Sequence, residues 1–335
     1  MSILKTIRSH EWWEYKLPPL LAIYFATAIV EGVSVADVSI RLLCILIFMT
    51  VGIVYVSIIN DVTDIDEDLA CGKSNRMANV KPLFRWLFPS LCVLIELGAI
   101  YYIREDILGV AFCALAWISF SLYSIPPVRL KKRGSLGVLA DACGAHLFPG
   151  LFMVAHLSYY TGHPINPYWF GAVAVWSLSY GLRGILWHQF YDRTKDIESG
   201  INTFAVKRSP RLFKRKEPVL TLVEMVALSI MLCLIAKPLV FIFLVLYLLL
   251  IFFRYIGFDT NIIMIVFPED QPYQILMAEF YQVFLPLSLL ISDAIIHPGT
   301  WLLVALYIFM FPNNLKVIVS DVNKLTRKII FKDKL

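Results

Sequence analysis

The chain has 335 residues, of which 59% are hydrophobic and only 16% are charged, and its mean hydropathy is +0.72. Soluble domains carry about 25% charged residues, so this composition argues against a soluble two-domain enzyme and against a disordered chain. The 30 basic and 25 acidic residues leave a net charge of +5. This modest excess needs no nucleic-acid partner, because lysine and arginine collect on the cytoplasmic loops of membrane proteins.

Long apolar runs follow one another along the chain and predict an all-α, polytopic transmembrane bundle of about nine to ten spans in one domain, residues 1–335. Backbone polar groups must be paired within lipid, so each run is expected to be a helix. We expect helices at 18–34, 38–59, 84–103, 107–124, 136–158, 167–190, 218–236, 238–256, 273–293 and 300–318. Thr161-Gly162-His163-Pro164 supplies a turn within the uncharged stretch 142–182. Lys237-Pro238 indicates either a tight hairpin or a kink.

Neither the cysteines nor the N-terminus suggests a secreted protein. The six cysteines form no CxxC pair and mostly lie in apolar runs, so we expect neither a zinc site nor a disulfide framework. The first apolar run follows the charged and aromatic stretch His10-Glu11-Trp12-Trp13-Glu14 and ends without a small-residue cleavage site. A cleavable signal peptide is therefore not expected.

Basic residues gather after the second, fourth and sixth predicted helices. They are Lys73, Arg76 and Lys81, then Arg129, Lys131, Lys132 and Arg133, then Lys207, Arg208, Arg211, Lys214, Arg215 and Lys216. The opposite loops are nearly free of positive charge. The positive-inside rule predicts a multi-pass protein of the cell (inner) membrane, with its N-terminus and the loops 60–82, 125–135 and 191–217 in the cytoplasm. With ten spans, the basic tail Lys324 to Lys334 is cytoplasmic as well.

Two acidic clusters stand at the cytoplasmic ends of apolar helices. The first covers residues 60–68, and the second begins at Asp192-Arg193-Thr194-Lys195-Asp196 and continues to Glu198 and Gly200. On a helix Asp61, Asp64 and Asp68 share one face, because they are three and four residues apart. Like charges stacked in this way repel each other, so a bound cation is the most direct reason for a protein to keep them.

Oxygen ligands without a Cys/His set indicate Mg²⁺ rather than zinc. The expected metal ligands are Asn60, Asp64, Asp68, Asp192 and Asp196. A single DxxxD is most often a solvated loop, but two acidic clusters at helix ends on the same side can hold Mg²⁺ ions against a diphosphate.

These elements together resemble the UbiA-type superfamily of intramembrane prenyltransferases. Asn60-Asp61-x-x-Asp64-x-x-x-Asp68 matches the first family motif, and Asp192-x-x-x-Asp196, with Gly200 and Thr203 after it, matches the second. Tyr123-Ser124-Ile125-Pro126-Pro127-Val128-Arg129-Leu130-Lys131 resembles the family's YSxPxxRLK segment, and the resemblance covers about residues 15–295. Two features depart from the pattern: Asn75-Arg76 is followed by Met77 where the family usually has proline, and the family commonly has nine spans.

The resemblance implies a helical bundle around a central cavity, capped by the cytoplasmic loops. An allylic polyprenyl diphosphate would bind there with Mg²⁺ and lose its polyprenyl group to an acceptor, with release of diphosphate. The catalytic acids would be Asp61, Asp64, Asp68, Asp192 and Asp196. Breaking the allylic C–O bond leaves negative charge that Mg²⁺, arginine and lysine stabilise, and a carbocation that a dry aromatic cavity shelters.

Further residues are candidates for substrate binding, and several of them also have a structural explanation. They are Asn60, Arg76, Tyr123, Arg129, Lys131, Arg183 and His188. Arg76, Arg129 and Lys131 suit the diphosphate, or they only set the topology. Arg183 lies nine residues before Asp192, about 13 Å deeper on a helix, and there binds substrate or forms a structural ion pair.

The remaining candidates are less specific. His188 lies one turn before Asp192 and either takes a proton from the acceptor, orients the aspartate or is structural. Tyr123 shapes the mouth of the cavity or belongs to an interfacial aromatic belt. Glu96, Glu224 and Glu279 lie within apolar runs, where interior hydrogen bonding is the simplest account.

Two other classes of function compete with prenyl transfer. A UbiA-like terpene cyclase would use the same ionisation without an acceptor, and a membrane transporter would place its acids near the bilayer midplane rather than at helix ends. The DG…AR…G…D…D pattern of CDP-alcohol phosphotransferases is absent from the sequence. The sequence leaves open the acceptor, the prenyl chain length and the oligomeric state.

Overall fold

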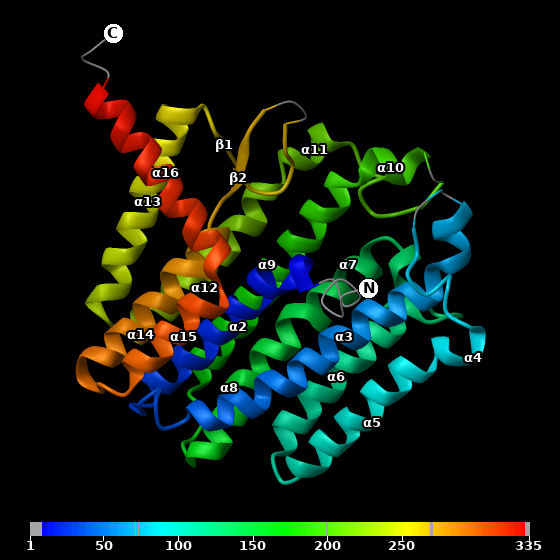
Figure 1. The fold of residues 1–335 in the computed structure, drawn as a ribbon, viewed down its shortest axis with the longest axis horizontal. Helices are drawn as coiled ribbons and strands as arrows, with labels where there is room; N and C mark the ends of the chain where they lie inside the picture. Colours follow the sequence, from blue (N-terminus) through cyan, green and yellow to red (C-terminus); the bar gives the residue numbers. More distant parts are fainter. Residues whose placement is uncertain (1–8, 71, 73, 199, 269–270, 332–335) are drawn as a thin grey trace.

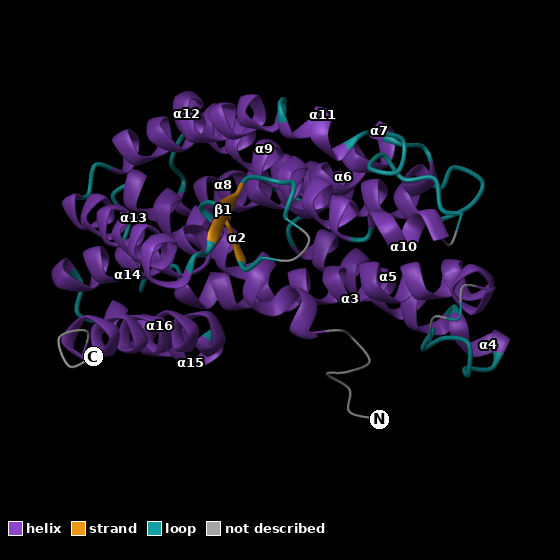
Figure 2. Ribbon diagram, turned by 90° about the horizontal axis from the view of Figure 1, so that it is seen from above, coloured by secondary structure: helices purple, strands orange, loops and turns teal. Residues whose placement is uncertain are grey.

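The structure is a computed structural model that describes residues 9–70, 72, 74–198, 200–268 and 271–331. Lys73 and Lys334, expected in the first basic loop and the basic tail, lie outside the described residues. The described chain is a bundle of helices with one short pair of strands (Figure 1). The strand pair lies at one edge of the bundle (Figure 1), and a view onto that edge shows the helices arranged around it (Figure 2).

The long helices of the bundle are α2 (Ser9–Val30), α3 (Ser39–Ala70), α5 (Leu87–Tyr102), α6 (Ile107–Ser124), α8 (Phe148–Thr161), α9 (Pro167–Tyr191), α12 (Glu217–Ile235), α13 (Pro238–Phe258) and α14 (Leu285–Ile296). Helix α16 (Pro312–Phe331) is also long, and the shorter helices are α4 (Pro82–Arg85), α7 (Ser135–Ala142), α10 (Arg193–Glu198), α11 (Pro210–Lys214) and α15 (Thr300–Met310). Strands β1 (Asn261–Ile263) and β2 (Tyr273–Ile275) pair in parallel.

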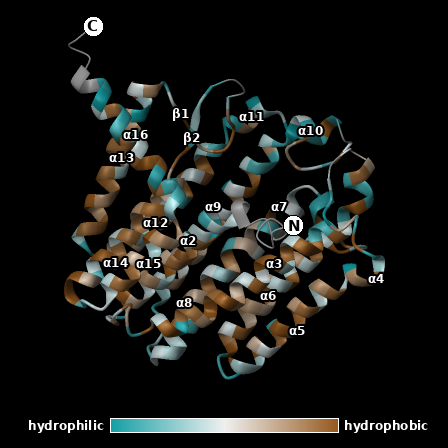
Figure 3. Cartoon of the chain, viewed as in Figure 1, coloured by the Kyte–Doolittle hydropathy of each residue, from teal (hydrophilic) through white to brown (hydrophobic). Residues whose placement is uncertain are grey.

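Six helical stretches among the described residues are long and apolar enough to cross a membrane. This confirms the predicted all-α polytopic membrane fold. Figure 3 shows hydrophobic residues along the long helices and hydrophilic residues gathered at α10, α11 and the adjacent loops. Helices α2 and α9 fall outside the six, and both contribute to the interior: Tyr24, Trp169 and Trp176 are fully buried. A helix that packs inside the bundle is shielded from lipid, so it does not have to be apolar on every face.

The turn predicted between two spans at residues 161–164 is confirmed. Helix α8 ends at Thr161, and Gly162 follows with φ +74°, a left-handed conformation that suits glycine. Helix α9 begins at Pro167, and the side chain of Asn166 accepts hydrogen bonds from the N–H groups of Tyr168 and Trp169. The sequence Lys237-Pro238 proves to be a tight connection, since α12 ends at Ile235 and α13 begins at Pro238.

The C-terminal predictions need two corrections. Residues 300–318 were expected to form one span, but α15 and α16 meet at an angle of 82°. Phe311 has non-helical dihedrals, and Pro312 after it disfavours helical geometry in the residue before it. The helix expected from residue 273 starts later, because Tyr273–Ile275 pairs with β1 instead.

Candidate active site

Both acidic clusters lie at the same end of the bundle. Helix α3 continues without a break through residues 60–68, and α10 with the second cluster lies beside its end in both views (Figures 1 and 2). The hydroxyl of Tyr123, at the end of α6, is close enough to Asp141, Asp64 and Asp196 for their charges to act on it. The three predicted motifs therefore meet around one point.

The first cluster is tied to the loop that follows it. The Nε of Arg76 donates a hydrogen bond of 2.5 Å to Oδ2 of Asp61, whose side chain is only 3% exposed. The amide of Asn75 donates to the backbone carbonyl of Asp61 and to Oδ2 of Asp68, both at 2.8 Å. Sequence reasoning missed Asn75 as a site residue, although its place directly before Arg76 was visible.

The contacts of Met77 explain how this chain differs here from the family pattern, which usually has proline at this position. Its backbone N–H donates a 2.9 Å hydrogen bond to Oδ1 of Asn75, a bond that proline cannot make because it has no N–H. The Met77 side chain is buried against Ile58 and Ile65 of α3. The loop is therefore held to α3 by different contacts from those a proline would allow.

Asp64 binds two of the predicted cations directly. Arg129 donates to Oδ1 of Asp64 at 2.5 Å, and Nζ of Lys131 lies 2.6 Å from each oxygen of the same carboxylate. Arg129 also donates to Oε1 of Glu67 at 2.6 Å, and Lys132 contacts that same oxygen. The YSxPxxRLK-like segment thus closes over the end of α3 through ion pairs.

Partial burial affects the two cations differently. Burial lowers the pKa of Lys131 despite the neighbouring Asp64. For Arg129 burial also acts to lower the pKa, but the hydrogen bonds that it donates to Asp64 and Glu67, and the negative charges of these acids, outweigh it, so the pKa is raised. Arg129 has φ 40°, an uncommon conformation for a residue other than glycine.

The second cluster is more open on one side. Asp192 follows the last residue of α9, and its Oδ2 lies 3.6 Å from Nδ1 of His188, whose side chain is 63% exposed. Asp196 on α10 is buried. The left-handed Gly200, with φ +68°, turns the chain after α10, as the G in the motif implies.

The remaining predicted metal ligand, Asn60, contacts the YSxPxxRLK-like segment at the end of α6. Its Oδ1 accepts a 2.5 Å hydrogen bond from Ser124, the residue after Tyr123. Asp141 is a further acid that sequence reasoning missed. It lies within electrostatic range of Tyr123, Lys16 and His188, and its only sequence signal is a single carboxylate in the apolar run of α7.

Arg183 lies away from this cluster, in an ion pair. Its Nε and Nη2 donate to the two oxygens of Glu224 on α12 at 2.7 and 2.8 Å, and Nη1 donates to the carbonyl of Leu276. The hydroxyl of Tyr281 donates to the same Glu224. Of the two readings that the sequence left open for Arg183, these contacts support the structural ion pair over substrate binding. They also account for Glu224 within its apolar run.

The donor set suits Mg²⁺ bound together with a phosphate. No three acidic, histidine or cysteine side chains in the described part of the chain are arranged to hold a metal by themselves. Mg²⁺ typically binds through one or two carboxylates, substrate phosphates and water rather than through an all-protein cage. Asn60, Asp64, Asp68, Asp192 and Asp196 offer the oxygen atoms that this mode of binding requires.

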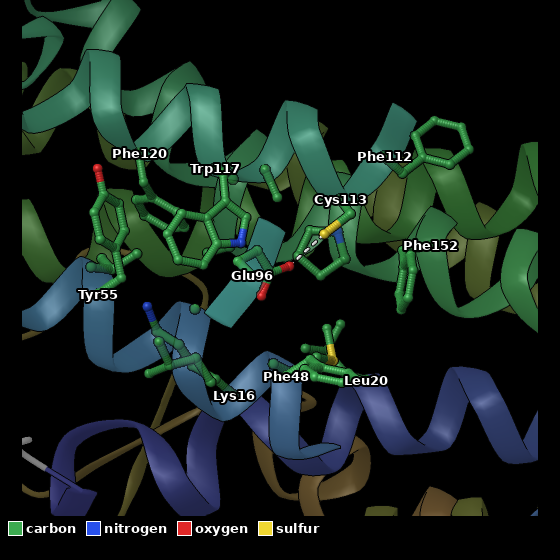
Figure 4. Close-up of a pocket in the computed structure, with 18 of the residues that line it drawn as sticks. Lys16, Leu20, Phe48, Tyr55, Glu96, Phe112, Cys113, Trp117, Phe120 and Phe152 are labelled. Atoms are coloured by element: carbon green, nitrogen blue, oxygen red, sulfur yellow. Dashed lines mark hydrogen bonds between the residues drawn. The ribbon is translucent and has the colours of Figure 1, made fainter. Parts of the chain in front are cut away.

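An apolar cavity of about 120 Å³ lies below the acids, between α2, α3, α5, α6 and α8 (Figure 4). Tyr55 and Phe120 stand at its acidic end, and Tyr55 is linked to α6 through a 2.8 Å hydrogen bond with Ser121. Phe112 and Phe152 stand at the other end. Aromatic faces of this kind stabilise positive charge and keep water away from it.

A membrane-embedded helical bundle with two aspartate motifs at one end, basic side chains between them and an apolar cavity below is the arrangement of an intramembrane prenyltransferase. The model of the UbiA prenyltransferase family matches residues 17–261, which is 245 of the 335 residues. The chain therefore belongs to the UbiA prenyltransferase family and is an integral, multi-pass membrane protein.

A solved structure supports the fold. The chain is similar to a UbiA homolog from Archaeoglobus fulgidus, whose structure was determined bound to DMAPP and Mg²⁺, with a TM-score of 0.54 and 14% sequence identity. The match covers 88% of this chain and 98% of the homolog. No curated protein matches the sequence.

Proposed function

We propose that the protein transfers a prenyl group from an allylic prenyl diphosphate to an acceptor in a Mg²⁺-dependent reaction that releases diphosphate. The observation that carries the proposal is the meeting of α3, α10 and the segment after α6 around Tyr123, with Asp64 bound to two cations. The homolog of known structure binds a prenyl diphosphate and Mg²⁺, which supports the same substrate class here.

The chain's own residues divide the work of the reaction. Arg129 and Lys131 neutralise the charge that the diphosphate gains as the allylic C–O bond breaks. Mg²⁺, when bound by Asn60, Asp64, Asp68, Asp192 and Asp196, would supply Lewis-acid stabilisation of that leaving group. The aromatic cavity excludes water while the carbon atom is cationic. As the acceptor bonds to that carbon it loses a proton, and the exposed His188 is the base that we propose takes it.

The proposal is tested with purified protein, Mg²⁺ and farnesyl diphosphate, with and without a membrane lipid extract as the source of acceptor. Released diphosphate is measured, and the products are identified by mass spectrometry. We expect release that depends on the extract and a product carrying an added farnesyl group. A cyclised hydrocarbon formed without extract would assign the protein to the cyclases instead.

Replacing either cation on Asp64 is expected to weaken substrate binding without preventing membrane insertion. A lost charge-assisted hydrogen bond costs about 1.5–3 kcal/mol, so Arg129→Ala and Lys131→Ala should each raise the Kd for farnesyl diphosphate roughly 10- to 150-fold. The measurement is a titration with Mg²⁺ present.

The matched control is Lys132→Ala. Lys132 has the same charge in the same segment, but it is 44% exposed and contacts Glu67 rather than Asp64. Its Kd should change little, since exposed ion pairs contribute little. Equal effects in all three variants, or none in Arg129→Ala and Lys131→Ala, would show that these two residues only set the membrane topology and do not bind the diphosphate. Arg76 is a poorer test, because its removal leaves the buried Asp61 without that partner.

We also propose that the acidic end of the bundle faces the cytoplasm, since the basic loops lie there. In a background without the native cysteines, single cysteines at the exposed Ser74 and Ser209 should resist an impermeant thiol reagent in intact cells. A cysteine at His163, in the loop between α8 and α9 at the other end, should react and serves as the control. Reaction at Ser74 and Ser209 with protection at His163 would reverse the proposed orientation.

A further inference from the structure

Two charged side chains line the apolar cavity, Lys16 of α2 and Glu96 of α5, and a hydrocarbon-binding site does not need the carboxyl group. Glu96 on α5 is only 5% exposed, and it lines the cavity together with Cys113 of α6 (Figure 4). Its neighbours on α5, Ile95 and Leu97, point outward and are about half exposed. A helix whose outer face is apolar therefore turns its single acid inward.

One oxygen of the Glu96 carboxyl group lacks a well-formed hydrogen bond. Oε1 accepts a 2.7 Å hydrogen bond from Sγ of Cys113, whereas Oε2 is buried and has no hydrogen bond of acceptable geometry to any residue that the structure describes. The indole of Trp117 on the same wall is close enough to interact with the carboxyl group, but it makes no hydrogen bond of good geometry to Oε2. A buried polar atom without a partner is unfavourable, so Oε2 requires water or a ligand group in the cavity.

The depth of Glu96 places it along the path of a bound tail. Trp117, beside Glu96, packs against Gly52 of α3, where a Cβ atom would lie 3.6 Å from the indole nitrogen, so Glu96 lies near the level of Gly52. Gly52 precedes Asp64 by 64 − 52 = 12 residues, which is about 18 Å along a helix. Glu96 thus stands well below the acids, where the far part of a prenyl chain would lie rather than its reacting carbon.

The smaller cavity beyond Glu96 is mostly apolar but includes polar side chains. A smaller cavity of about 20 Å³ begins at Glu96, Cys113 and Phe152 and is lined further on by Arg41 and His156. Arg41 donates to Nε2 of His156 at 2.8 Å, and Nδ1 of His156 lies 2.7 Å from Asp106. Glu96 therefore stands on a mostly apolar path, and the buried polar side chains of Arg41, His156 and Asp106 follow further on.

We propose that Glu96 sets the length of the prenyl tail that the protein accepts, favouring donors up to the farnesyl length over geranylgeranyl and longer chains. The inference rests on the proposed function for the identity of the donor. Water in the cavity can hydrogen bond to Oε2, but a hydrocarbon chain that passes Glu96 displaces that water and offers nothing in return. A chain that ends above Glu96 leaves the carboxyl group hydrated.

The test compares the wild-type protein with Glu96→Met, Glu96→Gln and Leu97→Met. Kd values are measured for geranyl, farnesyl and geranylgeranyl diphosphate with Mg²⁺. Wild-type affinity should rise to farnesyl and fall at geranylgeranyl diphosphate. Glu96→Met should bind geranylgeranyl diphosphate about 5- to 150-fold more tightly than wild type, which corresponds to the desolvation of one polar group, while its affinity for geranyl diphosphate stays nearly constant.

Two variants serve as controls. Glu96→Gln keeps a polar group in place and should keep the wild-type length preference, and Leu97→Met changes the lipid-facing neighbour and should do the same. Glu96→Met removes a partnerless polar atom, so we expect it to fold at least as stably as wild type. An unchanged length profile in Glu96→Met, or wild-type affinity that keeps rising through geranylgeranyl diphosphate, would overturn the proposal.

A parallel series with geraniol, farnesol and geranylgeraniol separates this inference from the proposed function. These alcohols probe the cavity without the diphosphate site. If no prenyl diphosphate binds but the alcohols show the same break in length and the same response to Glu96→Met, the proposed reaction fails and the tail-length inference stands. If the diphosphates bind and neither series breaks at Glu96, the inference alone fails.

Discussion

Asp64→Asn and Asp192→Asn are each expected to reduce turnover by at least about 10²- to 10³-fold, the loss seen when one preorganised charge-stabilising group is removed. Asp64 is the anchor of both Arg129 and Lys131, so its neutralisation also frees the cations that meet the diphosphate. Asp192 stands on the facing segment, after α9. If each supplies oxygen ligands for Mg²⁺ on one diphosphate, neither cluster can function alone.

The double variant gives this prediction its sharpest form. Residues that act as one unit are not additive, so Asp64→Asn/Asp192→Asn should be little worse than either single variant. Asp66→Asn is the matched control, because Asp66 lies on the same helix but is exposed. Turnover is measured as diphosphate release at saturating Mg²⁺. Near-normal turnover in either single variant, or a double variant as weak as the product of two independent losses, contradicts a shared metal site.

Breaking the ion pair between Arg183 and Glu224 is expected to cost about 3–5 kcal/mol of stability, because either single replacement leaves a buried charge unpaired. The side chains are 2% and 0% exposed. Arg183→Met and Glu224→Gln should therefore lower the Tm strongly in detergent. The double variant Arg183→Leu/Glu224→Leu should recover most of the loss, since no unpaired charge remains.

Substrate binding separates the two readings of Arg183. A structural ion pair predicts that the folded double variant binds farnesyl diphosphate with wild-type affinity, whereas a binding role predicts a large loss. Arg211→Met, which removes an exposed arginine from α11, is the control for a change of one basic residue and should leave the Tm almost unchanged. Single variants with wild-type stability would show that the pair does not hold α9 to α12.

Local patterns in the sequence predicted most of the fold. Uninterrupted apolar runs identified the long helices, and Gly162 with Pro164 located the turn between α8 and α9. The bend at Phe311 was missed because the apolar run from residue 300 was carried through Pro312-Asn313-Asn314 to residue 318, and hydropathy does not register a change of direction. The pairing of Tyr273–Ile275 with β1 depends on contacts between segments that no helical periodicity reveals.

The residues of the site could be predicted where the spacing of charged residues along a helix shows which of them share a face. The aspartates of the first cluster share a helix face whatever the rest of the chain does, and the structure adds the partners of Asp61 and Asp64 from loops that the motifs had marked. Arg183 and Glu224 are 41 residues apart in sequence, so only the packing of α9 on α12 identifies them as a pair. Glu96 looked like any acid within an apolar run, and its unpaired oxygen appears only once the cavity is known.

A Mg²⁺ titration of diphosphate release tests the central claim most directly. The wild-type protein is incubated with farnesyl diphosphate and membrane lipid extract, first in EDTA and then at increasing Mg²⁺, and released diphosphate and farnesylated product are measured together. We expect no product in EDTA, a saturable rise with Mg²⁺, and equal amounts of diphosphate and transferred farnesyl group. Full activity in EDTA, or no release at any Mg²⁺ concentration, would contradict a Mg²⁺-dependent prenyl transfer at this site.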